Sequence, residues 1–209
     1  MTRLEIINKY PTLRLGLKYI MLNNKSNLAP YHNLSHMLTV MKHCYDACEY
    51  MHMLDDEDDY IELLLLVALF NDYNHSMGRR DDGFNVAQAK LGLSQFLTEM
   101  DLEMPQYTSF MEGVLDATQY PYIIESDKLN IHQQIIRDAD LLQMAEPDWI
   151  PHVILGLCEE MHYPLDVLMI GERNFLKEMV FHTPYGKMMQ KTQGKRVWDE
   201  FKQLEKILK

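Results

Sequence analysis

Several features that define large classes of proteins are scarce in this chain of 209 residues. Its three cysteines leave no even disulfide framework, and no two of them form a CxxC zinc-binding pair. We therefore expect a reducing compartment, the cytoplasm, with small bacterial or viral proteins as the nearest analogy. The first ten residues lack the apolar core of a signal peptide, and the longest apolar run, residues 63–70, is too short to span a bilayer.

Positive charge is also scarce. The chain has 20 lysines and arginines against 31 aspartates and glutamates, which gives a formal net charge of -11. Sequence-independent binding to a nucleic-acid polymer needs many contacts from Lys and Arg to phosphates, so we expect no such partner. We also expect no membrane partner. A small anionic substrate is compatible with this charge, because a bound cation can reverse the local field. The sixteen methionines suit a core or a pliable interface, and so allow a homo-oligomer.

Strand-like alternation is hard to find, whereas helical spacing of apolar residues recurs along the whole chain. We expect helices over residues 4–23 (interrupted at Pro11), 30–51, 63–70, 85–100, 107–120, 130–144, 153–162, 164–180 and 196–209. Residues 55–59 (DDEDD) should form an acidic loop or a helix start, and residues 182–186 (HTPYG) a turn. No repeat or linker interrupts the series, so the sequence predicts an all-α fold with residues 1–209 in one compact domain.

One stretch, residues 63–78 (LLLLVALFNDYNHSMG), combines an apolar run with an abrupt polar end. The run predicts a buried helix that stops at Asn71 and Asp72, with His75 one turn later. Such an arrangement is typical of the floor of an active site. Asn and Asp are also ordinary helix-terminating residues, so the stretch alone does not separate the two interpretations.

Two other segments carry side chains of the same chemistry. His32 and His36 are four residues apart, so on a helix they would share one face. Asp138 and Asp140 are two apart, so one should face the core while the other meets Arg137 or solvent. A buried carboxylate needs a partner, and a metal ion is one such partner.

Histidines and carboxylates in this combination suit the hydrolysis of a phosphate ester. The transition state spreads negative charge over the phosphoryl oxygens, and divalent ions held by imidazole and carboxylate groups stabilise that charge and activate water. The leaving oxygen also needs a proton, for which a histidine beside the metals is the natural donor.

These motifs resemble the HD-domain phosphohydrolases, an all-helical superfamily of metal-dependent enzymes, and most closely its cyclic-nucleotide phosphodiesterases and related small hydrolases. Residues 31–40 match the signature YHNxxHxxxV at every fixed position, and residues 71–78 match HDxxHxG except at its first histidine. The likeness covers residues 31–85 well and the RDADLL segment, residues 137–142, moderately. It implies an all-α fold of the HD type with one or two divalent ions, for which Mn²⁺, Mg²⁺, Zn²⁺, Fe²⁺ and Co²⁺ are candidates.

The resemblance also implies a role for each matching residue. The ligands of the tighter metal would be His36, Asn71, Asp72 and Asp140, with Asp138 as the alternative to Asp140. The catalytic residues would be His32, His75 and Asp72. Asp72 would bridge to a second metal, and His75 would lie beside that metal and the attacking water. His32 would be the general acid that protonates the leaving oxygen.

Four further residues are candidates on weaker grounds. Asn33, Arg79 and Arg80 would contact the substrate, and arginine is well suited to phosphate oxygens. The two arginines equally fit a solvated basic pair beside two aspartates. Asn85 resembles a position of the family near the edge of the metal site, although the spacing here is longer.

Asn71 is the departure from the resemblance, because the family has a histidine there. An amide oxygen is a poorer ligand than imidazole for a transition metal, so metal affinity should fall and chemistry should slow or stop. The residue could mark a variant that uses one metal or a harder cation such as Mg²⁺. It could mark a degenerate member that only binds. Because every other signature position is intact, we favour a third interpretation, a His→Asn substitution introduced to inactivate the enzyme.

The sequence therefore predicts a metal-dependent phosphoric ester hydrolase with a small nucleotide as its partner. A phosphodiesterase for a cyclic nucleotide or cyclic oligonucleotide is the preferred form, because the histidine of the YHN motif could protonate a sugar oxygen. One alternative is removal of phosphate from nucleoside mono- or triphosphates. The other is a non-catalytic nucleotide-binding sponge, in which Asn71 has abolished turnover.

Overall fold

The structure is a computed structural model that describes residues 1–54, 59–102 and 104–208. The fold is all-α, as expected, and contains no strand among these residues. Its α-helices are α1 (Arg3–Lys9), α2 (Pro11–Asn23), α3 (Leu34–Tyr50), α4 (Asp59–Phe70), α5 (Asp82–Glu99), α6 (Thr108–Asp116), α7 (Ile131–Leu141), α8 (Gly156–Met161), α9 (Leu165–Glu178) and α10 (Pro184–Ile207). Short helical turns are η1 (Pro105–Tyr107), η2 (Ser126–Lys128), η3 (Leu142–Ala145) and η4 (Ile150–Leu155). The acidic segment predicted at residues 55–59 lies outside the described residues except for Asp59, where α4 begins.

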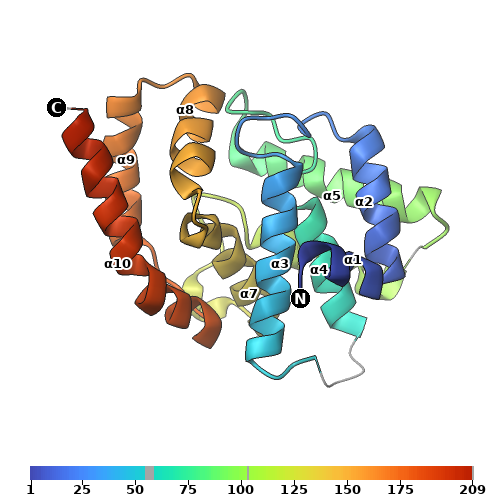
Figure 1. The fold of residues 1–209 in the computed structure, drawn as a ribbon. Helices are drawn as coiled ribbons and strands as arrows, with labels where there is room; N and C mark the ends of the chain where they lie inside the picture. The colour runs from blue at the N-terminus through green and yellow to red at the C-terminus, as the bar shows by residue number, and fades with distance from the viewer. Residues whose placement is uncertain (55–58, 103, 209) are drawn as a thin grey trace.

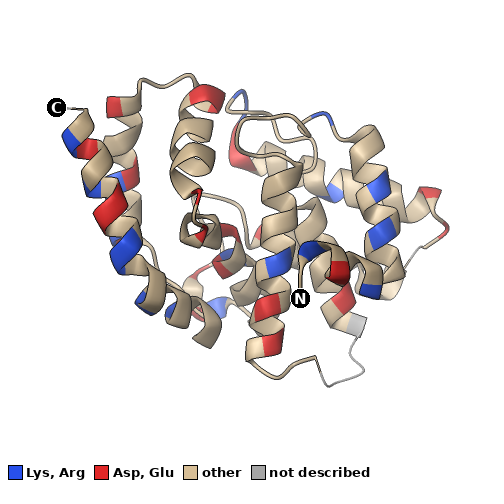
Figure 2. Cartoon of the chain, in the orientation of Figure 1, with Lys and Arg blue, Asp and Glu red and all other residues tan. Residues whose placement is uncertain are grey.

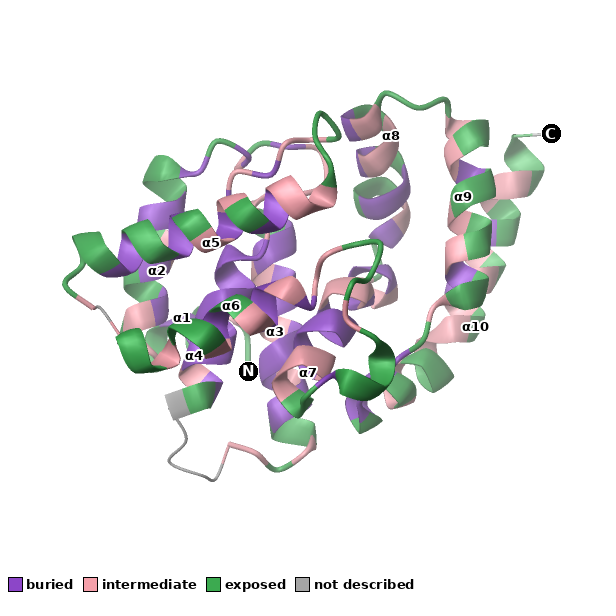
Figure 3. Ribbon diagram, turned by 180° about the vertical axis from the view of Figure 1, so that it is seen from behind, coloured by how far each residue is buried: buried purple, intermediate pink, exposed green. Residues whose placement is uncertain are grey.

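Helix α4 lies at the centre of the larger of two apolar clusters. Residues 63–70 are all buried, and α4 contacts α2, α3, α5, α6 and α7. Buried residues are concentrated in α3, α4 and α7 in the middle of the molecule (Figure 3). A helix that is apolar all round is typical of such a position, and each fully buried Leu or Phe contributes about 1.5–3 kcal/mol. We call α1–α7 the N-terminal bundle.

The second apolar cluster belongs to η3, η4, α8, α9 and α10, which we call the C-terminal layer. Its buried members are Met144, Trp149, Val153, Ile154, Met169, Leu176, Val197 and Phe201. Helices α8, α9 and α10 stand together on the side of the molecule opposite α2 (Figure 1). The layer joins the bundle through contacts of α10 and η3 with α3 and α7.

Charged residues follow no single face. In the view of Figure 2, Lys and Arg are interspersed with Asp and Glu along the described helices and form no continuous basic stripe. Within the described part of the chain, no helix combines the length and the apolar character that crossing a membrane requires.

Several predicted helix boundaries are wrong: α4 begins at residue 59, α6 ends at residue 116, and the helix predicted over residues 153–162 is η4 followed by α8. Two further errors, at the starts of α3 and α10, involve helix caps. Helix α3 begins at Leu34 and not at Pro30, because the side chain of Asn33 accepts hydrogen bonds from the backbone N–H groups of Ser35 and His36. His32 therefore precedes the helix, and the expectation that His32 and His36 share a helix face is wrong.

Helix α10 begins at Pro184, twelve residues before the predicted start, so the predicted turn at residues 182–186 is a helix start. The hydroxyl of Thr183 accepts from the N–H of Gly186 and donates to Asp138, which also accepts from the N–H of His182. A Cβ on Gly186 would lie 2.4 Å from Asp138 Oδ2, so this close approach requires glycine. The cap itself is local, from Thr183 to Gly186, and the contact with Asp138 on α7 holds Thr183 in place.

Candidate metal centre and adjoining cavity

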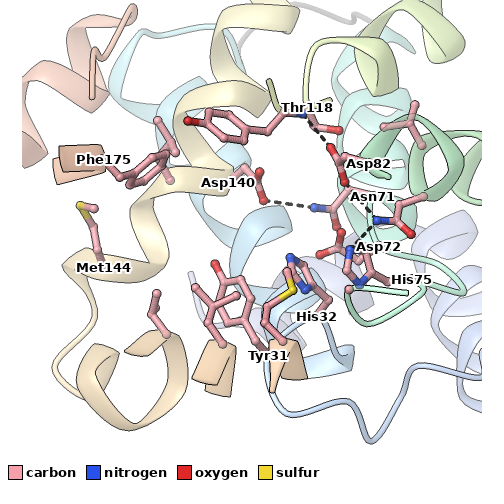
Figure 4. Close-up of a pocket in the computed structure, with 18 of the residues that line it drawn as sticks. Tyr31, His32, Asn71, Asp72, His75, Asp82, Thr118, Asp140, Met144 and Phe175 are labelled. Atoms are coloured by element: carbon pink, nitrogen blue, oxygen red, sulfur yellow. Dashed lines mark hydrogen bonds between the residues drawn. The ribbon is translucent and has the colours of Figure 1, made fainter. Parts of the chain in front are cut away.

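The end of α4 brings polar side chains to a cavity between the N-terminal bundle and the C-terminal layer. Asn71 and Asp72 follow Phe70, the last residue of the helix, and His75 follows one turn later. Asn71 and His75 are buried, and all three polar residues line the cavity (Figure 4). The buried helix expected over residues 63–70 is confirmed, and its end faces this cavity.

Two groups of metal-ligating atoms meet at Asp72. His36, Asp72 and Asp140 form one group, and His32, Asp72 and His75 form the other; within each group the ligand atoms lie within 4.8 Å of one another. His36 Nε2 is 3.0 Å from Asp140 Oδ1 and 3.2 Å from Asp72 Oδ2. Asp72 thus stands where one carboxylate reaches both groups, as a bridging ligand would.

The residues present suit a divalent ion. The amide oxygen of Asn71 is buried and has no hydrogen-bond partner among the described residues, and the buried Oδ2 of Asp72 has His36 Nε2 at 3.2 Å but no well-aligned hydrogen bond. Leaving such atoms without a partner is costly, and a cation is a natural partner for carboxylate and amide oxygens. The first group with Asn71 offers one nitrogen and several oxygens, a donor set that favours hard cations such as Mg²⁺ or Mn²⁺.

Asn71 itself lies at the edge of the first group. Its Nδ2 donates a long hydrogen bond of 3.4 Å to Asp140 Oδ1, which leaves the unpartnered oxygen on the other side of the amide. A histidine in this position would offer a ring nitrogen, whereas the amide uses its nitrogen as a donor to a ligand carboxylate. An asparagine here therefore gives a different donor set from the one that a histidine would give, and it still fills the position.

Gln143 was not predicted as a site residue, but it orients the ring of His36. Its Oε1 lies 3.3 Å from His36 Nδ1, on the side of the ring away from the two carboxylates. A hydrogen bond from Nδ1–H to this oxygen fixes the tautomer in which Nε2 is free to bind a metal. Burial lowers the pKa of His36, but the hydrogen bond to Asp140 and the charge of Asp72 outweigh it and raise the pKa overall.

Glu160, on α8, is the main residue that the motifs did not reveal. Its buried carboxylate accepts hydrogen bonds from the backbone N–H groups of Tyr31 and His32. The same carboxylate lies 2.5 Å from His32 Nδ1 and 3.2 Å from His75 Nδ1. Burial would raise the pKa of Glu160, but the hydrogen bonds with His32 and His75 lower it strongly. The carboxylate is therefore held ionised between two predicted catalytic histidines.

The same charges act on His32. Burial alone would lower its pKa, but the carboxylates of Asp72 and Glu160 raise it to about 9. The imidazole is therefore protonated at neutral pH, with Nδ1 directed at Glu160. Its ring is stacked on that of His75, with 3.7 Å between the ring centroids.

Asn85 lies where the weak resemblance suggested, beside His75. Ser76 N donates to Asn85 Oδ1, which identifies the amide nitrogen as the group that donates to His75 Nε2 over 2.8 Å. The other ring nitrogen, Nδ1, accepts from the backbone N–H of Met77 at 3.1 Å and lies 3.2 Å from Glu160 Oε1.

The two aspartates of the RDADLL segment have different roles. Asp140 belongs to the first metal-ligating group and lines the cavity. Asp138 is buried on the other side of α7, where it accepts hydrogen bonds from His182 and Thr183. Neither pairs with Arg137, which donates instead to backbone carbonyls of residues 117 and 124. The geometry thus favours Asp140 over Asp138 as the ligand.

Two of the three predicted substrate contacts lie away from the cavity. The side chain of Asn33 caps α3 and donates to the carbonyl of Ala29, so it is committed to the backbone. Arg79 is exposed and does not line the cavity. Arg80 does line it, with its guanidinium 4.9 Å from the ring centroid of Phe84.

The cavity measures about 350 Å³ and has two unlike ends. The donor end carries the metal-ligating groups just described. Tyr31 lies at the donor end, with its ring 4.7 Å from that of His36. The far wall is mostly apolar and aromatic, and its members are Val86, Tyr120, Tyr122, Leu141, Met144, Trp149, Val153, Leu157, Met161 and Phe175. Figure 4 shows Phe175 and Met144 across the cavity from His32 and His75. No sequence motif marked this wall, because it is assembled from segments with ordinary apolar spacing.

No protein-family model matches this chain, and no curated protein or solved structure is significantly similar to it.

Proposed function

We propose that this protein is a metal-dependent phosphohydrolase of the HD type, and preferably a phosphodiesterase acting on a cyclic nucleotide. The observation that carries the proposal is the position of Asp72, whose carboxylate is shared by two metal-ligating groups at the end of one cavity. Paired divalent sites that share a carboxylate suit the displacement of an oxygen from phosphorus.

The donor end would bind the phosphate, and divalent ions would be held by His36, Asn71, Asp72 and Asp140, with His75 at the second position. When bound, such ions would neutralise the negative charge on the phosphoryl oxygens and lower the pKa of a coordinated water. Arg80 adds a positive charge to the lining of the cavity. The net effect is a pocket for a phosphate in a protein that is acidic overall.

His32 is suited to the second requirement, a proton for the leaving oxygen. Glu160 is hydrogen-bonded to Nδ1 of His32, and the nearby carboxylates raise the pKa of His32 to about 9. The ring is therefore protonated at neutral pH. Nε2 is then the nitrogen that can deliver a proton into the cavity. A sugar oxygen needs such a donor more than the bridging oxygen of a nucleoside triphosphate does, which favours a phosphodiester substrate.

One observation favours a second candidate, a nucleotide-binding protein without turnover. Asn71 donates to Asp140 through its amide nitrogen and offers no imidazole to a metal. If the site cannot hold a metal firmly, the cavity could bind a nucleotide and not cleave it.

The test compares the chain as it stands with Asn71→His. Each is incubated with Mn²⁺ and, in turn, a cyclic nucleotide panel, a cyclic dinucleotide and nucleoside mono- and triphosphates, and products are separated by chromatography. We expect Asn71→His to hydrolyse a cyclic substrate at least tenfold faster, because imidazole restores a nitrogen ligand. Asn71→Gln is the control, because it retains an amide but cannot supply imidazole.

Four outcomes discriminate the candidates. Turnover of a phosphodiester by Asn71→His supports the phosphodiesterase, whereas turnover only of mono- or triphosphates overturns the preference for diesters. Tight nucleotide binding with no turnover by either protein supports the binding protein. Absence of both turnover and Mn²⁺ binding in Asn71→His would rule out the proposed hydrolase.

A further inference from the structure

Helix α9 presents a carboxyl group and an aromatic ring to the far wall of the cavity. Glu172 and Phe175 are three residues apart on this helix, and both line the cavity. Residues with this spacing share a helix face. The pair is therefore aimed at whatever part of a ligand extends away from the donor end.

Glu172 lacks a protein partner in this position. It makes no hydrogen bond or ion pair with any described residue, although loss of hydration in the cavity raises its pKa to about 7. Arg173, its neighbour in the sequence, points elsewhere and pairs with Glu205. Burying a carboxyl group without a hydrogen-bond partner lowers the stability of the folded protein. A ligand that donates hydrogen bonds to the carboxyl group would offset this loss.

The surroundings of Glu172 suit a flat ring. Phe175 meets Tyr120 edge to face with 5.8 Å between the ring centroids, and Tyr120 meets Tyr122 in the same way at 5.5 Å. Trp149, also in the wall, is fixed by a hydrogen bond from its Nε1 to Glu200. Aromatic walls hold planar heterocycles by stacking and by excluding water.

The size of the cavity limits the ligand to about one nucleotide. Its volume of about 350 Å³ is near the lower end of the usual range for small-molecule sites. Asp140 lies between Phe175 and the histidines of the donor end in Figure 4. A phosphate at the donor end would therefore leave its base at the far wall.

We propose that Glu172 recognises the base of a bound nucleotide and selects guanine, an inference that rests on the proposed nucleotide phosphohydrolase function. Guanine presents N1–H and N2–H side by side, and the two oxygens of a carboxylate accept from both. Adenine and cytosine place a ring-nitrogen lone pair beside their amino group, and uracil places a carbonyl oxygen on each side of its N–H. Against a carboxylate, each of these alternatives exchanges one hydrogen bond for a repulsion.

The experiment measures binding of guanosine 5′-monophosphate and adenosine 5′-monophosphate by calorimetry, at pH 8 with Mn²⁺ present. The proteins are the unaltered chain, Glu172→Gln, and Glu178→Gln as a matched control on the exposed end of the same helix. We expect the unaltered chain and the control to bind guanosine 5′-monophosphate at least tenfold tighter than adenosine 5′-monophosphate. In Glu172→Gln the ratio of these two affinities should fall to within about threefold of unity, because a carboxamide pairs comparably with both bases.

Equal affinity of the unaltered chain for the two nucleotides overturns the inference, as does a guanine preference that Glu172→Gln retains. These results are separable from failure of the proposed function. Turnover of nucleotides without base preference contradicts only the role of Glu172. A guanine preference that depends on Glu172, in a protein without hydrolytic activity even as Asn71→His, contradicts only the hydrolase.

Discussion

The N-terminal bundle and the C-terminal layer contribute to one cavity in different ways. The bundle supplies the metal-ligating side chains, from the starts and ends of α3, α4 and α7, and these are the residues that carry recognisable motifs. The layer supplies Glu160 on α8, Glu172 and Phe175 on α9 and Val153 on η4, none of which belongs to a motif. Residues of the bundle such as Tyr120 and Tyr122 complete the apolar wall. The candidate metal ligands thus come from the bundle, whereas the layer contributes Glu160, which contacts His32 and His75, and part of the far wall.

The largest expected effect is at Asp138, where α7 of the bundle contacts the start of α10 of the layer. The test compares the stability of variants at Asp138 and Asp140. Asp138→Ala should lower the free energy of unfolding by about 3 kcal/mol, because it leaves buried donors at the start of α10 without an acceptor. Asp140→Ala, two residues away, should change stability by no more than about 1 kcal/mol, because its carboxylate is partly exposed in the cavity. Urea denaturation measures both. Equal losses would contradict the assignment of a structural role to one aspartate and a ligand role to the other.

A second test concerns the bundle alone. Asp72→Asn should weaken Mn²⁺ binding by about 100-fold or more, since it removes the negative charge shared by both metal-ligating groups. The affinity can be followed by calorimetry or by electron paramagnetic resonance of free Mn²⁺. Asp127→Asn makes the same chemical change on the exposed surface and should leave the affinity unaltered. Binding that survives Asp72→Asn would place the metal elsewhere.

A third test asks whether the layer controls a histidine of the bundle. Glu160→Gln should lower the pKa of His32 from about 9 by more than one unit in the metal-free protein, because a charged acceptor becomes neutral. The imidazole resonances report this titration by NMR. Glu159→Gln alters the exposed neighbour of Glu160 and should not shift it. If the two variants titrate alike, His32 does not depend on α8.

The smallest expected effect concerns the pH dependence of stability at Glu172. Burial raises its pKa from 4.5 to about 7, so between these values the folded state binds more protons than the unfolded state. Stability must then fall as pH rises through this window. Glu172→Gln should match the unaltered chain near pH 4.5 and exceed it by about 1 kcal/mol at pH 8, a value reduced for partial exposure. The free energy of unfolding is measured by urea denaturation at each pH. If it changes with pH in the same way for the unaltered chain and Glu172→Gln, Glu172 is well solvated.

The sequence predicted much of the site because its signals are local. The apolar run of α4 ends where polar residues begin, and the spacing of histidines and aspartates on either side identified four segments that the structure brings together. The all-α class followed from helical periodicity alone. Local patterns of this kind persist because a helix repeats its contacts every three or four residues.

The predictions failed for two different reasons. Asn33 fits the YHN signature, yet its side chain caps the start of α3 by accepting from N–H groups two and three residues further along the chain, and so it does not face a ligand. The start of α10 depends on Asp138, more than forty residues away in the chain. That contact could not be read from neighbouring residues, because the acceptor, Asp138, belongs to another helix, α7.

By itself, the sequence determined the buried helix of residues 63–70 and its polar end at Asn71 and Asp72, because both follow from residue type and short-range spacing. Only the tertiary structure decided that Asp140 rather than Asp138 turns toward the cavity. Only the tertiary structure brought Glu160 to His32, across 128 positions of the chain. The physical reason is that hydrogen bonding and burial depend on which groups become neighbours, and packing of one helix layer on another selects those neighbours.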